Sequence, residues 1–285
     1  MLQGMACRRL VPAFIMLAAF ADVTARVQVH GHRGARAVRP ENTIPAFEYA
    51  IEAGADVLEL DLAVTRDDVL VASHDPVLPE ALCQGPPGAT RVIRGMTLAA
   101  LRRWDCGSLP NPAFPRQQTV PGTRVPTLDE VLDLAPRGRF HFNIETKIFP
   151  DKPELTPSPE EFARLLVEAV RRRGLESRVI IQSFDFRTLH AAAAMAPEIR
   201  RAALYSGPPR DFAAIARQAR ATLVSPHYSL VTPAAVRAAH EAGFPVVPWT
   251  ANTPADWDRL VAAGVDGIIT DDPAALIAHL RRPLR

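Results

Sequence analysis

Side chains able to catalyse reactions at phosphate gather in the first third of the chain. His32 and Arg33 come first, Glu59 and Asp61 follow, and His74 comes last; each group lies in or directly after an apolar run typical of a β-strand. Side chains two positions apart on a strand point to the same face, so Glu59 and Asp61 present two carboxylates to one point. Histidines, a guanidinium and paired carboxylates are the groups that metal-assisted cleavage of a phosphate ester requires.

A third carboxylate repeats this spacing farther along the chain. Glu145 and Lys147 are two positions apart at the end of the strand-like run 140–147. Three carboxylates with no thiolate nearby favour one divalent cation, Ca²⁺ or Mg²⁺, over Zn²⁺. The apolar neighbours of Glu59 and Asp61 predict a strand buried on both faces, where carboxylates need a cation.

Each of these groups also has a purely structural interpretation. An acidic pair on a strand can belong to a solvated face, and His74 can be a hydrogen-bonded histidine of the core. The types of these residues alone leave both alternatives open.

The elements around these residues predict a (β/α)8 TIM barrel. Strand-like and helix-like periods alternate after residue 25, which is typical of a parallel sheet, and about 260 residues suit one such barrel. The predicted strands span residues 27–31, 57–62, 69–74, 140–146, 179–183, 201–205, 222–225 and 246–250.

Sequence patterns typical of helix N-termini lie between the predicted strands. Ser158-Pro159-Glu160-Glu161 has the pattern of a capping box with proline at the first helical position. The apolar stripe that follows, from Phe162 to Ala169, has helical spacing, and Gly174 marks its end. Similar starts occur at Thr127, Thr232 and Thr253.

Residues 1–25 have the pattern of an export signal. Arg8 and Arg9 precede an apolar run over 10–20, and small residues suitable for cleavage follow. The run is short for a membrane span, although an uncleaved anchor is the alternative. We therefore expect a signal peptide at 1–25, a barrel domain at 26–285, an exported and periplasmic protein, and no stable membrane insertion after removal of the leader.

The segment 76–126 interrupts the alternation. It is rich in proline and glycine and follows the third predicted strand, so we expect an insertion at the catalytic face of the barrel, with a short helix near 97–102. Cys83 and Cys106 both lie in this insertion. Export would favour a disulfide between them, but the sequence does not determine their distance, and two free cysteines remain the alternative.

Composition excludes some classes of partner. The formal net charge is +2, there is no basic stripe, and aromatic residues make up 6% of the chain. These features argue against nucleic-acid binding and favour a small-molecule partner, while the oligomeric state stays open.

In combination, the motifs resemble those of bacterial, exported members of the glycerophosphodiester phosphodiesterase family. The resemblance runs from about residue 29 to about residue 273. The motifs that carry it are His32-Arg33-Gly34, Pro40-Glu41-Asn42-Thr43, Glu59-Leu60-Asp61, His74-Asp75, Val125-Pro126-Thr127-Leu128, Asn143-Ile144-Glu145-Thr146-Lys147, Gln182-Ser183-Phe184, Trp249-Thr250-Ala251-Asn252 and Asp266-Gly267-Ile268-Ile269-Thr270-Asp271.

The resemblance implies hydrolysis of a glycerophosphodiester to an alcohol and glycerol 3-phosphate in a barrel with an insertion after the third strand. It implies acid–base catalysis by His32 and His74. It further implies a divalent cation held by Glu59, Asp61 and Glu145, phosphate contacts from Arg33 and Lys147, and cleft walls formed by Phe184 and Trp249. Which histidine is the base, and whether water or the glycerol hydroxyl attacks the phosphate, stay open.

Three alternatives differ in class. A lysophospholipase D-like or sphingomyelinase D-like enzyme would act on lipids with a similar set of residues. A non-enzymatic binding protein would have no need for two histidines. A glycosidase that uses Glu59 and Glu145 would leave Arg33, Lys147 and both histidines without a role.

Overall fold

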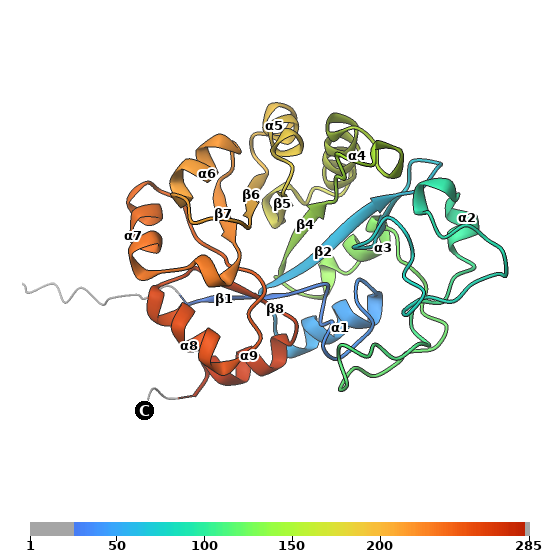
Figure 1. The fold of residues 1–285 in the computed structure, drawn as a ribbon, viewed down its shortest axis with the longest axis horizontal. Coiled ribbons are helices and arrows are strands. Elements are labelled where there is room, and N and C mark those ends of the chain that lie inside the picture. The colour runs from blue at the N-terminus through green and yellow to red at the C-terminus, as the bar shows by residue number, and fades with distance from the viewer. Residues whose placement is uncertain (1–25, 283–285) are drawn as a thin grey trace, which may run out of the picture.

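The computed structural model describes residues 26–282. Its strands form a curled sheet that closes into a barrel, and most helices lie around the outside of it (Figure 1). The strands are β1 Gln28–Gly31, β2 Val57–Val64, β3 Leu70–Ala72, β4 His141–Thr146, β5 Val179–Ser183, β6 Arg200–Tyr205, β7 Leu223–Pro226 and β8 Gly267–Thr270. The predicted export leader at residues 1–25, with Cys7, lies outside the described residues.

Parallel pairing orders the barrel strands as β7-β6-β5-β4-β2-β1-β8. The segment 246–250 closes the gap between β7 and β8: it forms parallel bridges from Val246 to Val224 and from Trp249 to His227. On its other side, the Ile269 amide donates to the Pro248 carbonyl oxygen. Eight parallel segments thus surround one core, and the predicted (β/α)8 barrel is confirmed.

The predicted third strand, 69–74, has a different role from the one expected. It is the short strand β3, which runs antiparallel to β2 and is not a strand of the barrel. The Thr65 amide donates to the Val69 carbonyl oxygen, so only a tight turn joins the two strands, and a tight turn cannot connect parallel neighbours. The third barrel strand is therefore β4, and the last is β8, which the list of predicted strands omitted.

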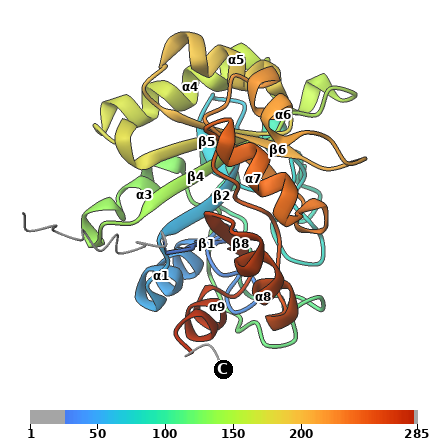
Figure 2. The ribbon, with the colours of Figure 1, turned by 90° about the vertical axis from the view of Figure 1, so that its left-hand side faces the viewer.

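All but one of the described helices cover the outside of the barrel, as Figures 1 and 2 show from two directions; the exception is α2, which lies in the insertion. They are α1 Ile44–Ala53, α2 Leu98–Leu101, α3 Leu128–Leu132, α4 Pro159–Arg172, α5 Phe186–Met195, α6 Phe212–Gln218, α7 Pro233–Glu241, α8 Pro254–Ala263 and α9 Pro273–Leu280. Short 3₁₀ turns lie at Ile93–Gly95, Ala135–Arg137, Pro153–Leu155, Glu176–Arg178 and Tyr228–Leu230. Within residues 26–282, no helix is both long and apolar enough to cross a membrane.

The predicted helix starts are confirmed, with one difference in detail. The hydroxyl oxygens of Ser158, Thr232 and Thr253 each accept a backbone N–H of the first helical turn. The reciprocal capping box forms at Thr127 and Glu130, at the start of α3. At Ser158 only one of the two hydrogen bonds of a capping box forms. The Ser158 hydroxyl accepts from the Glu161 amide, whereas the Glu161 carboxylate pairs with Arg164 on the surface of α4.

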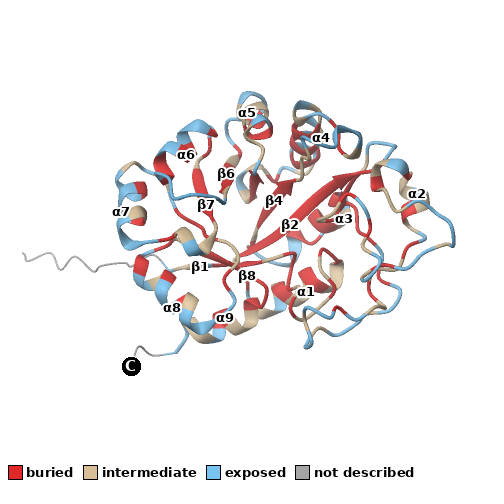
Figure 3. Cartoon of the chain, viewed as in Figure 1, coloured by how far each residue is buried: buried red, intermediate tan, exposed pale blue. Residues whose placement is uncertain are grey.

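Most residues of the barrel strands are buried. All eight residues of β2 are buried, and Figure 3 shows buried residues concentrated in the barrel strands. The insertion has a small core of its own, in which Leu78, Ile93, Leu101 and Trp104 pack with Val71 of β3. A disulfide joins Cys83 and Cys106, whose Cα atoms are 4.1 Å apart. The insertion is therefore a packed structure anchored on the β2–β3 pair.

Candidate active site

A tight turn after β1 presents the first two candidate residues. Arg33 and Gly34 both have positive φ, 49° and 81°. A Cβ atom at Gly34 would lie 2.7 Å from the backbone of Ala46 in α1, so only glycine fits this position. The left-handed conformation of Arg33 is strained, and it lets the Arg33 amide donate to Glu59 Oε2 at 2.8 Å.

Three buried carboxylates meet where β2 and β4 run side by side. Asp61 is in register with Glu145 across the two strands, and Glu59 lies two positions earlier on the same face as Asp61. One oxygen from each of the three lies within 4.8 Å of the others. The donor set consists of oxygen atoms only, so its chemistry fits a hard divalent cation such as Ca²⁺ or Mg²⁺.

Two cationic side chains lie against these carboxylates. Lys147 Nζ is 3.3 Å from Asp61 Oδ1 and 2.9 Å from Glu145 Oε1, and Arg33 Nε is 3.2 Å from Asp61 Oδ2. Burial favours the neutral acid at Asp61, but the charges of Lys147 and Arg33 hold the pKa of this carboxyl well below its ordinary value. Burial raises the pKa of Glu59 well above its ordinary value and that of Glu145 to about 7. Two cationic side chains thus face three buried carboxylates, and a divalent cation would supply further positive charge to this cluster.

His32 is held by the carboxylate of Asp271, the residue that follows the last barrel strand. Its Nδ1 is 2.5 Å from Asp271 Oδ1, and its Nε2 lies 4.0 Å from Glu59 Oε2. Asn252 donates to the other oxygen of Asp271 at 2.7 Å and so fixes that carboxylate. Burial lowers the pKa of His32, while Asp271 acts in the opposite direction.

His74 lies two residues after β3 and lines the same cleft as His32. Its Nδ1 lies 2.9 Å from Asp75 Oδ1, and its side chain is 32% exposed. This exposure argues against the alternative of a histidine enclosed in the core.

A cleft with a volume of about 180 Å³ lies over the carboxylates. The structure brings all nine predicted site residues into its lining: His32, Arg33, Glu59, Asp61, His74, Glu145, Lys147, Phe184 and Trp249. The rings of Phe184 and Trp249 meet edge to face at 5.3 Å. Phe184 is 44% exposed, so this aromatic pair lies at the mouth of the cleft.

Four residues that hold this site in place were not among the site residues predicted from the sequence. Asn42 Nδ2 donates to Asp61 Oδ2 at 2.9 Å, and Gln182 Nε2 donates to Glu59 Oε1 at 2.7 Å. Glu41 accepts a hydrogen bond from Arg33 at 2.6 Å, and Asp271 contacts His32. All four lie within the motifs that carried the family resemblance, and that position was the only available signal.

Comparison with known proteins identifies one family. The model of the glycerophosphoryl diester phosphodiesterase family matches residues 32–275. A glycerophosphodiester phosphodiesterase of Caldanaerobacter subterraneus is 35% identical over 254 residues, which cover 89% of this chain and 98% of the relative. One from Bacillus subtilis is 32% identical over 258 residues, which cover 87% and 84% of the two chains.

Solved structures agree. A putative glycerophosphoryl diester phosphodiesterase from Silicibacter pomeroyi superposes with a TM-score of 0.83 at 33% identity, over 90% of this chain and 93% of the other. A phosphodiesterase from Oleispira antarctica, solved in complex with the product sn-glycerol-3-phosphate, gives a TM-score of 0.76 at 23% identity and covers 90% and 97%. At that identity the second likeness concerns the fold alone.

Proposed function

Since this chain belongs to the glycerophosphoryl diester phosphodiesterase family and is a phosphoric diester hydrolase, we propose that it cleaves glycerophosphodiesters to an alcohol and glycerol 3-phosphate. The observation that carries the proposal is the single cleft in which two histidines, two cationic side chains and three buried carboxylates meet. The relatives from Caldanaerobacter subterraneus and Bacillus subtilis, both named glycerophosphodiester phosphodiesterases, support this substrate class.

The carboxylates of Glu59, Asp61 and Glu145 are the proposed ligands of one divalent cation, Ca²⁺ or Mg²⁺. When bound, that ion supplies positive charge which offsets the anionic phosphate and its transition state. Gln182 and Asn42 hold two of the carboxylates by hydrogen bonds, as supporting residues around metal ligands commonly do.

Arg33 and Lys147 are the proposed phosphate contacts. Both side chains are nearly buried, with exposures of 10% and 12%, and both line the cleft. A phosphodiester anion resists nucleophilic attack until its charge is offset, and a guanidinium can bind two phosphoryl oxygens at once. Phe184 and Trp249 would pack against the glycerol moiety at the mouth of the cleft.

His32 and His74 are the proposed acid–base pair. The contact between His32 Nδ1 and Asp271 favours the tautomer with its proton on Nδ1, so Nε2 can accept a proton from the attacking oxygen. His74, the more exposed of the two, would then protonate the leaving alcohol. Water is the proposed nucleophile, and attack by the neighbouring glycerol hydroxyl to give a cyclic phosphate is the alternative.

The test is release of glycerol 3-phosphate from glycerophosphoglycerol and glycerophosphocholine, measured with and without a chelator. We expect release that the chelator abolishes. Absence of release from both substrates in the presence of Ca²⁺ or Mg²⁺ would overturn the proposal.

Export of the protein to the periplasm is a separate proposal, which rests only on the sequence of residues 1–25. N-terminal sequencing of the protein recovered from the periplasm of an expressing cell tests it.

A further inference from the structure

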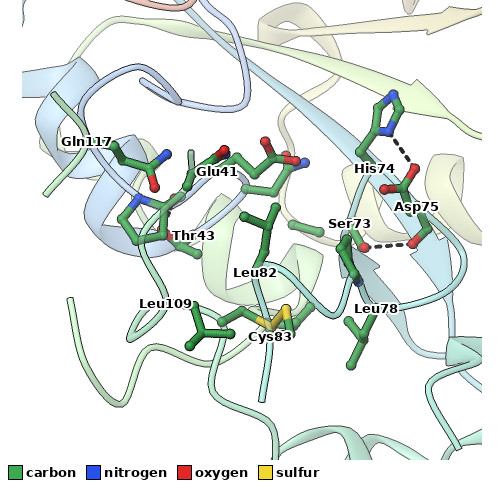
Figure 4. A pocket seen from close by; sticks show the side chains of 17 residues that line it. Glu41, Thr43, Ser73, His74, Asp75, Leu78, Leu82, Cys83, Leu109 and Gln117 are labelled. Atoms are coloured by element: carbon green, nitrogen blue, oxygen red, sulfur yellow. Dashed lines mark hydrogen bonds and ion pairs between the residues drawn. A yellow bond between two sulfur atoms is a disulfide. The ribbon is translucent and has the colours of Figure 1, made fainter. Parts of the chain in front are cut away.

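A second pocket lies beside the cleft, between the barrel and the insertion. The turn Pro40–Thr43 and the segment Ala72–Asp75 contribute its barrel side, and Leu78, Leu82, Leu109 and the Cys83–Cys106 disulfide contribute the insertion side. In Figure 4, Glu41 and His74 lie on one side of Leu82, and Leu109 and Cys83 lie on the other.

The pocket adjoins the place where the phosphate would bind. His74 lines both the pocket and the cleft. Two further residue pairs form the wall between them, because Arg33 of the cleft contacts Glu41 of the pocket at 2.6 Å and Asp61 contacts Asn42 at 2.9 Å. A phosphodiester has two arms. If the glycerol arm lies on Phe184 and Trp249, the other arm can leave the phosphate past His74.

The size of the pocket limits what can enter it. Its interior volume is about 40 Å³, which is room for roughly three water-sized groups. A fatty acyl chain far exceeds that room, and a trimethylammonium group fits it poorly. A leaving alcohol with a short chain fits.

The charges around the pocket favour an uncharged group. Glu41 is paired with Arg33 at 2.6 Å and with Arg36 at 3.4 Å, and Asp75 is paired with His74 at 2.9 Å. Among the described residues that line the pocket, His74 alone carries an aromatic ring, so there is no aromatic cage for an ammonium ion. The lining offers an ammonium group leucine side chains and uncharged polar groups such as Asn111 and Gln117, but no unpaired carboxylate to replace its hydration.

We infer that this pocket is the subsite for the leaving alcohol and that it selects a short, uncharged alcohol. The inference rests on the proposed function, since it concerns the second arm of the same substrate. It also places the leaving alcohol on the His74 side of the phosphate, because His74 is the histidine that lines both the pocket and the cleft.

The bond changes follow from this placement. A new P–O bond forms to the attacking water, which gives up a proton to His32 Nε2. The P–O bond to the leaving alcohol breaks, its electron pair remains on the alcohol oxygen, and that oxygen takes a proton from His74 Nε2. The products are glycerol 3-phosphate and the free alcohol.

Two substrates of equal length test the selection. The propan-1-ol and ethanolamine esters of glycerol 3-phosphate differ at one end group, which is a methyl in the first and an ammonium in the second. We expect kcat/KM to be at least about tenfold higher for the propan-1-ol ester and lower still for the choline ester. An ethanolamine ester cleaved as well as the propan-1-ol ester, or better, would overturn the selection of an uncharged group.

Variants that fill the pocket test its location. Leu82 is half-buried in the pocket wall, so Leu82→Trp should lower kcat/KM for the propan-1-ol ester by about tenfold. The methanol ester, whose leaving group is too short to enter, should change less than about twofold. Val77→Trp is the matched control, because Val77 belongs to the insertion, is 38% exposed and lies outside the pocket lining.

The outcomes separate the subsite from the proposed function. An equal loss for the propan-1-ol and methanol esters in Leu82→Trp, with the melting temperature retained, would overturn the subsite and leave the proposed function standing. If the wild-type protein cleaves none of the esters, the proposed function fails, and the subsite fails with it. Leu109→Trp fills the same pocket from another position and gives the same test if Leu82→Trp does not fold.

Discussion

Asp271 Oδ1 lies 2.5 Å from Nδ1 of His32, although 239 positions separate the two residues in the sequence. Asp271 follows β8 and His32 follows β1, and these two strands are neighbours in the barrel. The contact orients the imidazole so that Nε2 faces the carboxylates. Asp271 is therefore a positioning residue for His32.

The first prediction concerns this contact. Asp271→Asn should lower kcat by about 10²-fold, because an amide can present its NH₂ to Nδ1 and favour the other tautomer. KM should change little, since Asp271 is not among the residues that line the cleft. Steady-state kinetics on a glycerophosphodiester give both values.

Asp272→Asn is the matched control for Asp271→Asn. Asp272 caps α9 through the Ala275 amide and pairs with Arg116 of the insertion, so this change should lower the melting temperature and leave kcat nearly unchanged. A similar loss of kcat in both variants would assign Asp271 a general structural role instead.

The second prediction concerns the two histidines. His32→Ala and His74→Ala should each lower kcat by about 10²-fold or more, the scale of lost acid–base catalysis. Both variants should fold, because neither histidine is a large part of the core. If His74→Ala melts far below the wild type and keeps its specific activity, then His74 is structural.

The third prediction is dependence on a divalent cation. EDTA should abolish activity, and Ca²⁺ or Mg²⁺ should restore it. Cation at about 100 times its Kd should also stabilise the folded protein by roughly 2.7 kcal/mol, which thermal unfolding detects without any substrate. Full activity after exhaustive chelation would exclude the metal site.

The matched pair for this prediction is Glu145→Gln and Glu154→Gln. Glu145→Gln removes one of three carboxylate ligands and should lose most activity together with the thermal shift caused by the cation. Glu154 is exposed on a surface turn, and its change should alter neither property.

The fourth prediction concerns the pH dependence of the insertion. Asp105 accepts hydrogen bonds from the Gly107, Ser108 and Gly122 amides and from the Ser108 hydroxyl. Partial burial would raise the pKa of Asp105, but these hydrogen bonds outweigh it and lower the pKa to about 2. A carboxyl whose pKa is lowered by folding stabilises the native state above its unfolded pKa, and this stabilisation is lost as the pH falls.

Asp105→Asn should therefore lower the melting temperature at pH 7. The difference from wild type should shrink as the pH falls from about 4 towards about 2, because the wild-type carboxyl is then protonated as well. A difference that stays constant over this window would show that the carboxylate charge does not matter. Asp151→Asn, on an exposed surface turn, is the control.

The fifth prediction concerns the cysteines. The chain has three, Cys83 and Cys106 form a disulfide, and Cys7 would leave with the proposed leader. Thiol titration of the unfolded, unreduced mature protein should detect no free thiol. Two free thiols per mature chain would contradict the disulfide, and one would indicate that Cys7 is retained.

Cys83→Ser tests the energetic role of the disulfide. The disulfide closes a loop with a sequence separation of 23, and a loop of that length should stabilise the protein by about 3 kcal/mol. Denaturant unfolding of Cys83→Ser and of the wild type measures the difference. Equal stability of the two proteins would contradict the prediction.

Local rules explain what the sequence by itself determined. Alternation along a strand places Glu59 and Asp61 on one face of β2 and Glu145 and Lys147 on one face of β4. Cap residues such as Thr127 and Ser158 determine where helices begin, because they satisfy backbone N–H groups within a few positions. These relationships involve neighbours in the chain, so each pair of charged side chains, most strand boundaries and several helix starts could be predicted.

Only the tertiary structure decided the relationships between distant segments. The direction of β3, the place of β8 in the barrel and the contact between Asp271 and His32 depend on which strands become neighbours. The pocket between Leu82 and His74 exists because the insertion folds back over the segment that follows β3. Such contacts depend on packing between elements far apart in the sequence, and residue types and spacing carry no measure of those distances.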